Sequence, residues 1–300
     1  MIKSLKWYAS SHVINMKGWN GKILRVDLTE GSTEITSYSD DIAKKFIGGR
    51  GLAVKLLWDE LPKGADPLGP ENMLIFATGP YTAFNVPNSG KLVVASKSPL
   101  TGGYGDGNIG TRAATNLRKC GVDAVVITGK AKEPVYLYVE DEKAEILDAS
   151  HLWGKSSYEA EDWLFDKHGK STGTLLTGQS GENLCLLSTV VSQRGRAGGR
   201  PGMGAVMGSK NLKAAVFKGS KELPAYEPEK LKELGRKGFR KIPNYDAYNY
   251  WKKVGTMMAA DMMQTASALP TRNFSEGIFE EINKDRKSTR LNSSHRLRSR

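Results

Sequence analysis

Two glycine-rich segments hold the residues of this chain that are best suited to bind an anion. Residues 103–110 read Gly-Tyr-Gly-Asp-Gly-Asn-Ile-Gly, and residues 194–208 contain three arginines and six glycines. Glycine lets backbone N–H groups approach a phosphate closely, and the guanidinium group of arginine can donate to a phosphate through two N–H groups at once. Two such segments in one domain predict a ligand with two phosphate groups, or two phosphorylated ligands.

The first segment also contains Gly-x-Gly-x-x-Gly, at residues 105–110. In a dinucleotide-binding fold that pattern directly follows a strand and opens a helix within a β-α-β unit. Here residues 98–104 separate it from the preceding predicted strand, so we expect a phosphate-binding loop rather than a nicotinamide or flavin site. For the second segment a flexible, solvated loop stays open as the alternative, although Met203, Val206 and Met207 are unusual in such linkers.

Other residue types that carry chemistry form no recognisable site. The cysteines, Cys120 and Cys185, lack Cys-x-x-Cys spacing, and we expect both to be small core residues in a reducing compartment. An iron–sulfur cluster needs four thiolates, so these two could not hold one alone. We expect surface or structural roles for the histidines, and a helix core for the grouped methionines: His12, His151, His168, His295, Met257, Met258, Met262 and Met263.

The hydrophobic pattern predicts a β-rich α/β domain over residues 16–220 and the truncated start of a helical domain over residues 221–284. In the helix expected at residues 51–61, the buried face should include Leu52, Val54 and Leu56. The predicted strands are 22–28, 32–38, 73–78, 91–97, 123–128, 135–140, 144–147, 173–176, 186–191 and 214–218. The predicted helices are 40–46, 51–61, 111–119, 156–165, 224–240 and 245–268.

Both ends of the sequence differ from this pattern. Residues 285–295 match the translation of a common DNA-sequencing adaptor, so we expect residues 285–300 to be an adaptor-derived tail, with a natural basic tail as the alternative. The regular hydrophobic pattern begins directly after Met16, which could be the true start of the protein. We therefore expect residues 1–15 to be a non-native extension. We therefore expect this chain to be the front part of a longer protein.

The net charge of +12 is not a reliable sign of nucleic-acid binding. Residues 285–300 hold six lysines and arginines against one aspartate, which leaves +7 for the rest of the chain. The remaining positive charges are interleaved with acids, and no nucleic-acid-binding module is recognisable. No apolar run is long enough to cross a membrane, and residues 1–15 are too polar for a secretory signal, so we expect a cytoplasmic protein without nucleic-acid or membrane partners.

Several longer motifs occur in a fixed order. They are Trp-Asn-Gly-Lys-Ile-Leu-Arg-Val-Asp-Leu at 19–28, Ile-Gly-Gly-Arg-Gly-Leu-Ala at 47–53, Asp-Pro-Leu-Gly-Pro-Glu-Asn at 66–72, Lys-Ser-Pro-Leu-Thr-Gly at 97–102, Ala-Ser-His-Leu-Trp-Gly at 149–154, Gly-Glu-Asn at 181–183 and Gly-Met-Gly-Ala-Val-Met-Gly-Ser-Lys-Asn at 202–211. In these motifs the chain resembles the N-terminal half of the tungsten- or molybdenum-dependent aldehyde:ferredoxin oxidoreductases. The likeness covers residues 17–220 and continues more weakly to about Phe279.

The resemblance implies an α/β (α+β) fold in which paired β-sheets with flanking helices form a base, followed by the start of an all-helical domain. Two molybdopterin-type pterins would lie on the base and hold one tungsten or molybdenum atom, and their phosphates would share a Mg²⁺ ion. The backbone carbonyls of Asn108 and Ala197 would face that Mg²⁺. The cofactor-binding residues implied in this chain are Lys91, Asn108, Gly110, Arg196, Ala197, Gly199 and Arg200.

The implied reaction oxidises a small aldehyde to a carboxylic acid and passes electrons through a [4Fe–4S] cluster to ferredoxin. The cluster cysteines and the substrate pocket would lie beyond Lys284, so we expect no catalytic residue in this chain and no turnover by it alone. By the same resemblance we expect a homo-oligomer. A standalone pterin-binding or scaffold protein without catalysis is the alternative, and a basic nucleic-acid-binding protein is a weaker one.

Overall fold

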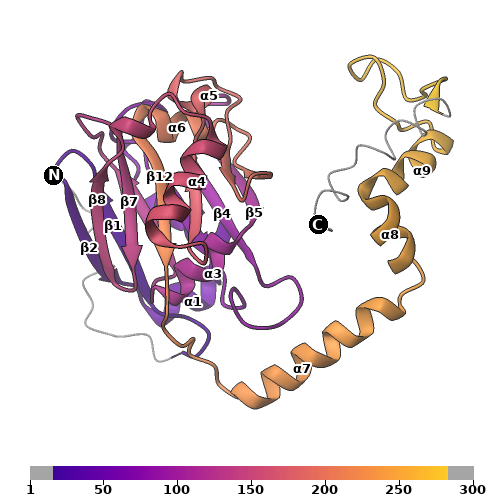
Figure 1. Ribbon diagram of the computed structural model, residues 1–300, viewed down its shortest axis with the longest axis horizontal. Helices are drawn as coiled ribbons and strands as arrows, with labels where there is room; N and C mark the ends of the chain where they lie inside the picture. The colour runs from indigo at the N-terminus through magenta and orange to yellow at the C-terminus, as the bar shows by residue number, and fades with distance from the viewer. Residues whose placement is uncertain (1–15, 283–300) are drawn as a thin grey trace. The chain divides into compact units, whose positions relative to one another are not determined.

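Two six-stranded sheets dominate the structure, a computed structural model that describes residues 16–282 (Figure 1). The first sheet has the order β2-β1-β6-β3-β4-β5 and the second β11-β10-β9-β12-β7-β8. The first comprises β1 (Lys22–Asp27), β2 (Ser32–Ser37), β3 (Leu74–Thr78), β4 (Lys91–Lys97), β5 (Tyr104–Gly110) and β6 (Ala124–Thr128). The second comprises β7 (Val135–Glu140), β8 (Lys143–Asp148), β9 (Gly173–Leu176), β10 (Val190–Ser192), β11 (Arg196–Gly198) and β12 (Leu212–Lys218).

Each sheet is mixed, with a single parallel pair among its neighbours. β1 runs parallel to β6, β12 runs parallel to β7, and the other neighbouring strands are antiparallel. The central strands are buried on both faces, in agreement with the apolar run Leu-Ile-Phe-Ala at the start of β3. The predicted fold class, paired sheets with flanking helices followed by further helices, is confirmed.

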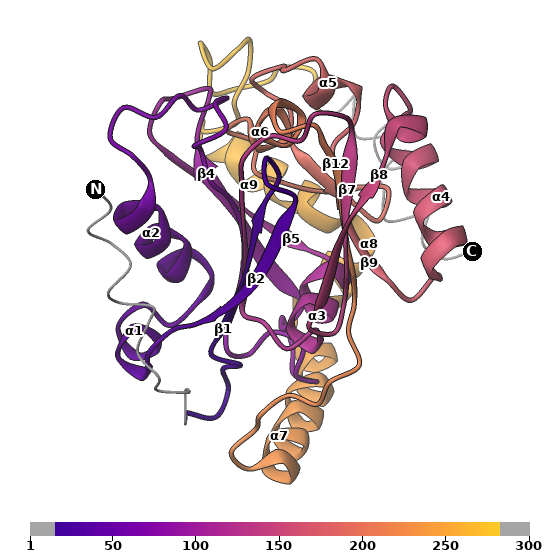
Figure 2. The ribbon, with the colours of Figure 1, turned by 90° about the vertical axis from the view of Figure 1, so that its left-hand side faces the viewer.

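Helices cover both outer faces of the sheet pair and also fill the space between the sheets. The main core joins both sheets with α3 (Arg112–Lys119) and α6 (Met203–Ser209). A second core lies between the first sheet and α1 (Asp40–Phe46) and α2 (Gly49–Glu60), and a third between the second sheet and α4 (Ser157–His168). Figure 2 shows α2 and α4 on opposite sides of the two sheets.

Local signals explain why these helices begin where they do. Ser156 and Glu159 form a capping box at α4, in which Glu159 Oε2 accepts from the Ser156 N–H at 2.9 Å. Thr111 caps α3 by accepting from the Ala113 N–H at 3.1 Å. In α2 the prediction was wrong for Val54, whose side chain is 38% exposed because it lies on the outer face of the helix.

Two further predictions about burial were also wrong. Cys120 is fully buried, as expected, but Cys185 is exposed because it lies in the loop after the short helix α5 (Gln179–Glu182). The methionines expected in a helix core include Met257, Met262 and Met263, and these three are exposed. The segment that carries them contains only short helices.

The chain divides into two compact units, the first ending at Leu231 and the second beginning at Lys232. The helix α7 (Pro228–Lys241) spans this point, and it is followed by η3 (Ile242–Asn244), α8 (Tyr248–Val254), η4 (Gly255–Met258) and α9 (Ala259–Thr265). The helix predicted over residues 245–268 is therefore broken into shorter pieces. Among residues 16–282, no helix is both long and apolar enough to cross a membrane.

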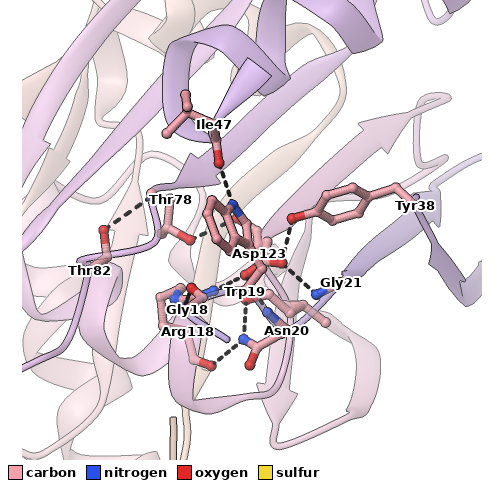
Figure 3. A network of polar contacts seen from close by, with 12 residues as sticks. Gly18, Trp19, Asn20, Gly21, Tyr38, Ile47, Thr78, Thr82, Arg118 and Asp123 are labelled. Carbon is pink, nitrogen blue, oxygen red and sulfur yellow. Dashed lines mark hydrogen bonds and ion pairs between the residues drawn. The ribbon is translucent and has the colours of Figure 1, made fainter. Parts of the chain in front are cut away.

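A buried ion pair fixes the C-terminal end of α3. Arg118 pairs with Asp123, and both side chains are almost completely inaccessible (Figure 3). Asp123 Oδ2 also accepts from the Tyr38 hydroxyl at 2.6 Å and from the Gly21 N–H at 2.7 Å, while Arg118 donates to the Gly18 carbonyl at 2.7 Å. The start of the described chain, β2 and α3 are thereby tied to one carboxylate.

Candidate functional site

The two glycine-rich segments meet along a seam between the edges of the two sheets. β5 is the edge strand of the first sheet and β11 that of the second. A Cβ atom added to Gly107 in β5 would collide with the backbone nitrogen of Gly199, and one added to Gly198 in β11 would lie 3.0 Å from the Ile109 Cβ. Only glycine allows such close approach of two backbones. We call this contact between β5 and β11 the glycine seam.

The predicted site was expected to consist of two loops, and this prediction was wrong. Residues 104–110 were expected to be a loop but form strand β5, and residues 194–208 contain β11 and most of α6. The glycines at 107 and 198 are required for packing between the sheets, so they are not free to curve around a ligand. Sequence reasoning selected both segments but did not predict that their glycines allow the two sheet edges to pack together.

The predicted Mg²⁺-facing residues lie next to each other at this seam. Asn108 in β5 and Ala197 in β11 are both exposed. A Cβ on Gly198, the neighbour of Ala197, would lie 3.4 Å from the Asn108 carbonyl oxygen. The contact between the two edge strands therefore brings both predicted residues close together at the surface.

Three of the predicted cofactor-binding residues line a shallow cavity of about 390 Å³ at one end of the seam. These are Lys91, Gly110 and Arg196. Gly199 lies in the seam, and Arg200 is exposed but does not line the cavity. Sequence reasoning missed the other lining residues, which are Asn88, Gly90, Thr111, Arg112, Thr115 and Gln193. Arg112 could have been found, because it follows the first glycine segment at the predicted helix start.

The cavity is rich in uncompensated positive charge. Within residues 16–282, no carboxylate forms an ion pair with Lys91, Arg112 or Arg196. The first turn of α3 contains no acidic residue. A basic residue at a helix N-terminus opposes the helix dipole, and both favour negative charge at this end of α3.

A buried carboxylate holds the β10–β11 turn that carries part of the cavity. Glu161 in α4 is 1% exposed and accepts from the backbone N–H groups of Gln193 at 2.7 Å and Arg194 at 2.9 Å, and from the Thr174 hydroxyl at 2.5 Å. Gln193 and Arg194 both have positive φ, of 47° and 58°. The Glu161 bonds stabilise this otherwise strained turn.

The turn is also joined directly to α3. The Gln193 side-chain oxygen accepts from the Arg112 N–H at 2.8 Å, and the hydroxyls of Thr111 and Ser192 lie 2.6 Å apart. The positions of the cavity walls are thus set by contacts between the two sheets, and the first-turn amides of Arg112 and Ala113 are already bonded.

Another cation, Arg50, forms an ion pair with a residue of β5. Arg50, in the first turn of α2, pairs with Asp106, and this hydrogen bond raises the pKa of Arg50. Burial raises the pKa of the neighbouring Tyr104 phenol. Asp106 and Asn108 are two residues apart and so face the same side of the strand.

Metal ligands of the usual side-chain kind do not gather in the part of the chain that the structure describes. No group of three or more His, Cys, Asp or Glu residues among residues 16–282 is placed to hold a metal ion.

Comparison with known proteins gives consistent matches. The family model described as "Aldehyde ferredoxin oxidoreductase, N-terminal domain" matches residues 23–219. A tungsten-containing aldehyde ferredoxin oxidoreductase of Pyrococcus abyssi is 42% identical over 267 residues, which are 88% of this chain and 44% of that protein. The WOR-like subunit of an aliphatic sulfonate oxidoreductase of Pyrococcus furiosus is 36% identical over 279 residues, 87% of this chain and 44% of that protein.

A solved structure shares the same architecture. The active site complex BamBC of benzoyl coenzyme A reductase, bound to 1,5-dienoyl-CoA, matches with a TM-score of 0.73 and 34% identity. The match covers 76% of this chain and 35% of that chain. The present chain therefore spans less than half the length of each of these proteins.

Proposed function

Because the chain belongs to the aldehyde ferredoxin oxidoreductase family, we propose that residues 16–220 form the cofactor-binding base of an oxidoreductase that acts on aldehydes. The family assignment predicted from the sequence motifs is confirmed by these matches. The activity of the whole protein is part of the proposal, since the chain spans 44% of the length of these relatives.

The proposed cofactor is a tungsten- or molybdenum-bis-molybdopterin. Its phosphates would be held by the cations of the cavity and bridged by Mg²⁺ against the backbone carbonyls of Asn108 and Ala197. The residues present fit such a group: Lys91 and Arg196 have no carboxylate partner among residues 16–282, and Mg²⁺ prefers oxygen ligands that include phosphate. Gly110, Gly199 and Arg200 complete the proposed contacts.

The proposed reaction converts an aldehyde and water to a carboxylic acid, two protons and two electrons. The metal–dithiolene centre would supply the two-electron redox chemistry, while the protein binds and orients it. In this chain the seam residues would fix the position of the cofactor, and Lys91 and Arg196 would neutralise phosphate charge. Transfer of the electrons through a [4Fe–4S] cluster to ferredoxin belongs to the rest of the proposed protein.

A single observation supports this function best: the two glycine segments, 92 residues of sequence apart at Gly107 and Gly199, are brought together at one seam with a basic cavity at its end. The specific aldehyde is not part of the proposal. Relatives with the same domain are described by different substrates, so we infer that substrate choice resides outside residues 16–220.

The proposal is tested by producing the chain in a host that makes tungsten or molybdenum pterin cofactors. Elemental analysis and the fluorescence of oxidised pterin should detect metal and pterin with the purified chain, and Arg196→Gln should lower both. Viologen-linked aldehyde oxidation should be absent for this chain. Purified chain without pterin, under conditions where a full-length relative is loaded, would contradict the proposal.

The extent of the parent protein is tested separately at the DNA level. Sequencing the source DNA beyond codon 284 should reveal an open frame that contains a Cys-x-x-Cys-x-x-x-Cys run. A stop codon at that position would instead favour a standalone cofactor-binding protein. We also propose a cytoplasmic location and assembly as a homo-oligomer.

A further inference from the structure

We propose that Arg112 is a further anion-binding residue and that, with Lys91 and Arg196, it makes the cavity at the N-terminus of α3 a phosphate site. The inference deepens the proposed function and rests on it for the identity of the natural ligand. Its evidence is separate, because it depends on the cavity and on charges from three different elements. The relevant chemistry is a terminal phosphate or diphosphate group.

The three cations reach the cavity from separate parts of the fold. Lys91 begins β4, Arg112 begins α3 and Arg196 begins β11. All three are exposed and line the same cavity of about 390 Å³. Their convergence therefore depends on the packing of the two sheets and is not a property of one basic segment.

The Arg112 side chain is partly fixed before any ligand binds. One of its terminal nitrogen atoms donates to the Lys170 carbonyl, and its backbone N–H donates to Gln193 at 2.8 Å. A guanidinium group has five N–H donors, so the contact with Lys170 leaves others for an anion. Partial fixation reduces the side-chain entropy lost on binding.

The arrangement also shows which groups the anion would use. Thr111 and Gln193 already accept from the first-turn amides of Ala113 and Arg112. An anion in this cavity would therefore be held by the side chains of Lys91, Arg112 and Arg196. Among the uncharged lining residues, the Thr115 hydroxyl already donates to the Arg112 carbonyl at 2.9 Å, and the Asn88 amide could donate a further hydrogen bond.

The inference predicts that the full chain binds inorganic phosphate and pyrophosphate, measured by isothermal titration calorimetry at low ionic strength. Arg112→Gln should weaken binding roughly tenfold, the size expected for one charge-assisted hydrogen bond. Arg112→Lys keeps the charge and should recover part of the loss. Stronger binding of pyrophosphate than of phosphate would identify a diphosphate group as the preferred ligand, and equal binding a monophosphate.

Arg194→Gln is the matched control, because Arg194 is exposed on the adjoining turn but pairs with Asp162 and does not line the cavity. It should change phosphate affinity less than twofold, and circular dichroism should show that all variants are folded. The inference is overturned if wild-type chain binds neither anion, if Arg112→Gln binds like wild type, or if Arg194→Gln loses as much affinity as Arg112→Gln.

The outcomes also separate this inference from the proposed function. Phosphate binding that depends on Arg112, in a chain that never acquires pterin, would support the anion site and contradict the cofactor. Pterin loading that is lost in Arg196→Gln but unchanged in Arg112→Gln would support the cofactor and contradict the role of Arg112.

Discussion

Lys210 is a buried cation that forms no ion pair with a carboxylate among residues 16–282, although the charge of the nearby Asp27 favours its protonated form. Its side chain is 0% exposed, and its ammonium group donates to the carbonyls of Pro70 and Gly129, each at 3.1 Å. Burial lowers the pKa of Lys210 to about 8. The residue joins the loop before β3 to the turn after β6, and it does so at the expense of ammonium solvation.

The stability of the fold should therefore depend on the protonation of Lys210. Unfolded lysine has a pKa of about 10.4, so between about pH 8 and pH 10 the unfolded chain holds a proton that the folded chain has lost, and stability rises with pH. Relative to Lys210→Met, the free energy of unfolding of wild type should rise by roughly 3 kcal/mol across this range. Denaturant unfolding at several pH values measures it.

The control is Lys130→Met, which removes an exposed lysine near the same turn. The difference between this control and wild type should stay constant with pH. Parallel pH curves for wild type and Lys210→Met would contradict the assignment. Comparing variants is necessary because burial also raises the pKa of Cys120, which contributes an opposite slope at alkaline pH.

At the scale of the elements, the glycine seam is the contact that creates the candidate site. β5 and β11 are edge strands in different sheets, and each is hydrogen-bonded to a single neighbouring strand within residues 16–282. The direct approach of their backbones replaces the side-chain layer that normally separates packed sheets by about 10 Å. Any side chain in this contact should force the two edges apart.

Gly107→Ala should therefore destabilise the fold by roughly 3 kcal/mol, because its Cβ would collide with the Gly199 backbone. Gly103→Ala is a matched control in the same segment, since the nearest atom to its Cβ would be the Thr101 hydroxyl at 3.9 Å. Thermal and denaturant unfolding of the two variants provide the measurement. Equal stability of both variants would show that the seam is not tightly packed.

The Glu161 carboxylate stabilises the β10–β11 turn by accepting hydrogen bonds from its backbone. Glu161→Gln should lower stability by roughly 2 kcal/mol, because an amide replaces a carboxylate that accepts three hydrogen bonds. Hydrogen exchange at the Gln193 and Arg194 amides should accelerate. Glu145→Gln, at an exposed position, should change stability by less than about 0.5 kcal/mol. Unchanged exchange at both amides would contradict this role.

The predicted elements show where sequence reasoning succeeds and where it fails. The apolar run of β3 and the capping box of α4 are local signals, and both elements form where the sequence predicts them. β5 was missed because three of its seven residues are glycine, which disfavours a strand locally. Its strand conformation depends on pairing with β4 and on contact with β11, which no local pattern reveals.

In the candidate site, too, some residues were predicted from the sequence and others were missed. Lys91 and Arg196 were implied by the family resemblance and do line one cavity. Arg112 and Gln193 were missed because their importance depends on a contact between residues distant in sequence. Their roles in binding, like those of Asn108, Gly110 and Ala197, stay predictions until they are measured.

At the scale of the whole molecule, the two units differ in the surfaces they expose. In the first unit, residues 219–224 return to the sheet domain: the Lys221 N–H donates to the Lys119 carbonyl at 3.0 Å, and the Gly18 N–H donates to the Pro224 carbonyl at 2.5 Å. The second unit exposes many large apolar side chains. They are Leu234, Phe239, Tyr245, Tyr250, Trp251, Met257, Met262, Met263, Phe274 and Ile278.

We predict that a fragment of residues 16–231 retains the stability of the sheet domain. Its melting temperature should lie within a few degrees of that of the full chain, and it should bind less of the apolar dye ANS, because the exposed side chains of the second unit are removed. A fragment ending at Lys218 loses two backbone hydrogen bonds and should be less stable by roughly 2 kcal/mol. Equal dye binding by the full chain and the first fragment would contradict this view.

The position of β12 has a consequence for the order in which the chain can acquire its fold during synthesis. β12 is the last strand in sequence among residues 16–282, yet it lies between β9 and β7 and completes the middle of its sheet. A nascent chain that ends at residue 211 would contain β7 and β9 but not β12, the strand that lies between them in the sheet. The second sheet can close only after Lys218 leaves the ribosome, so this domain should fold late and depend on contacts between distant residues, which are slow to form.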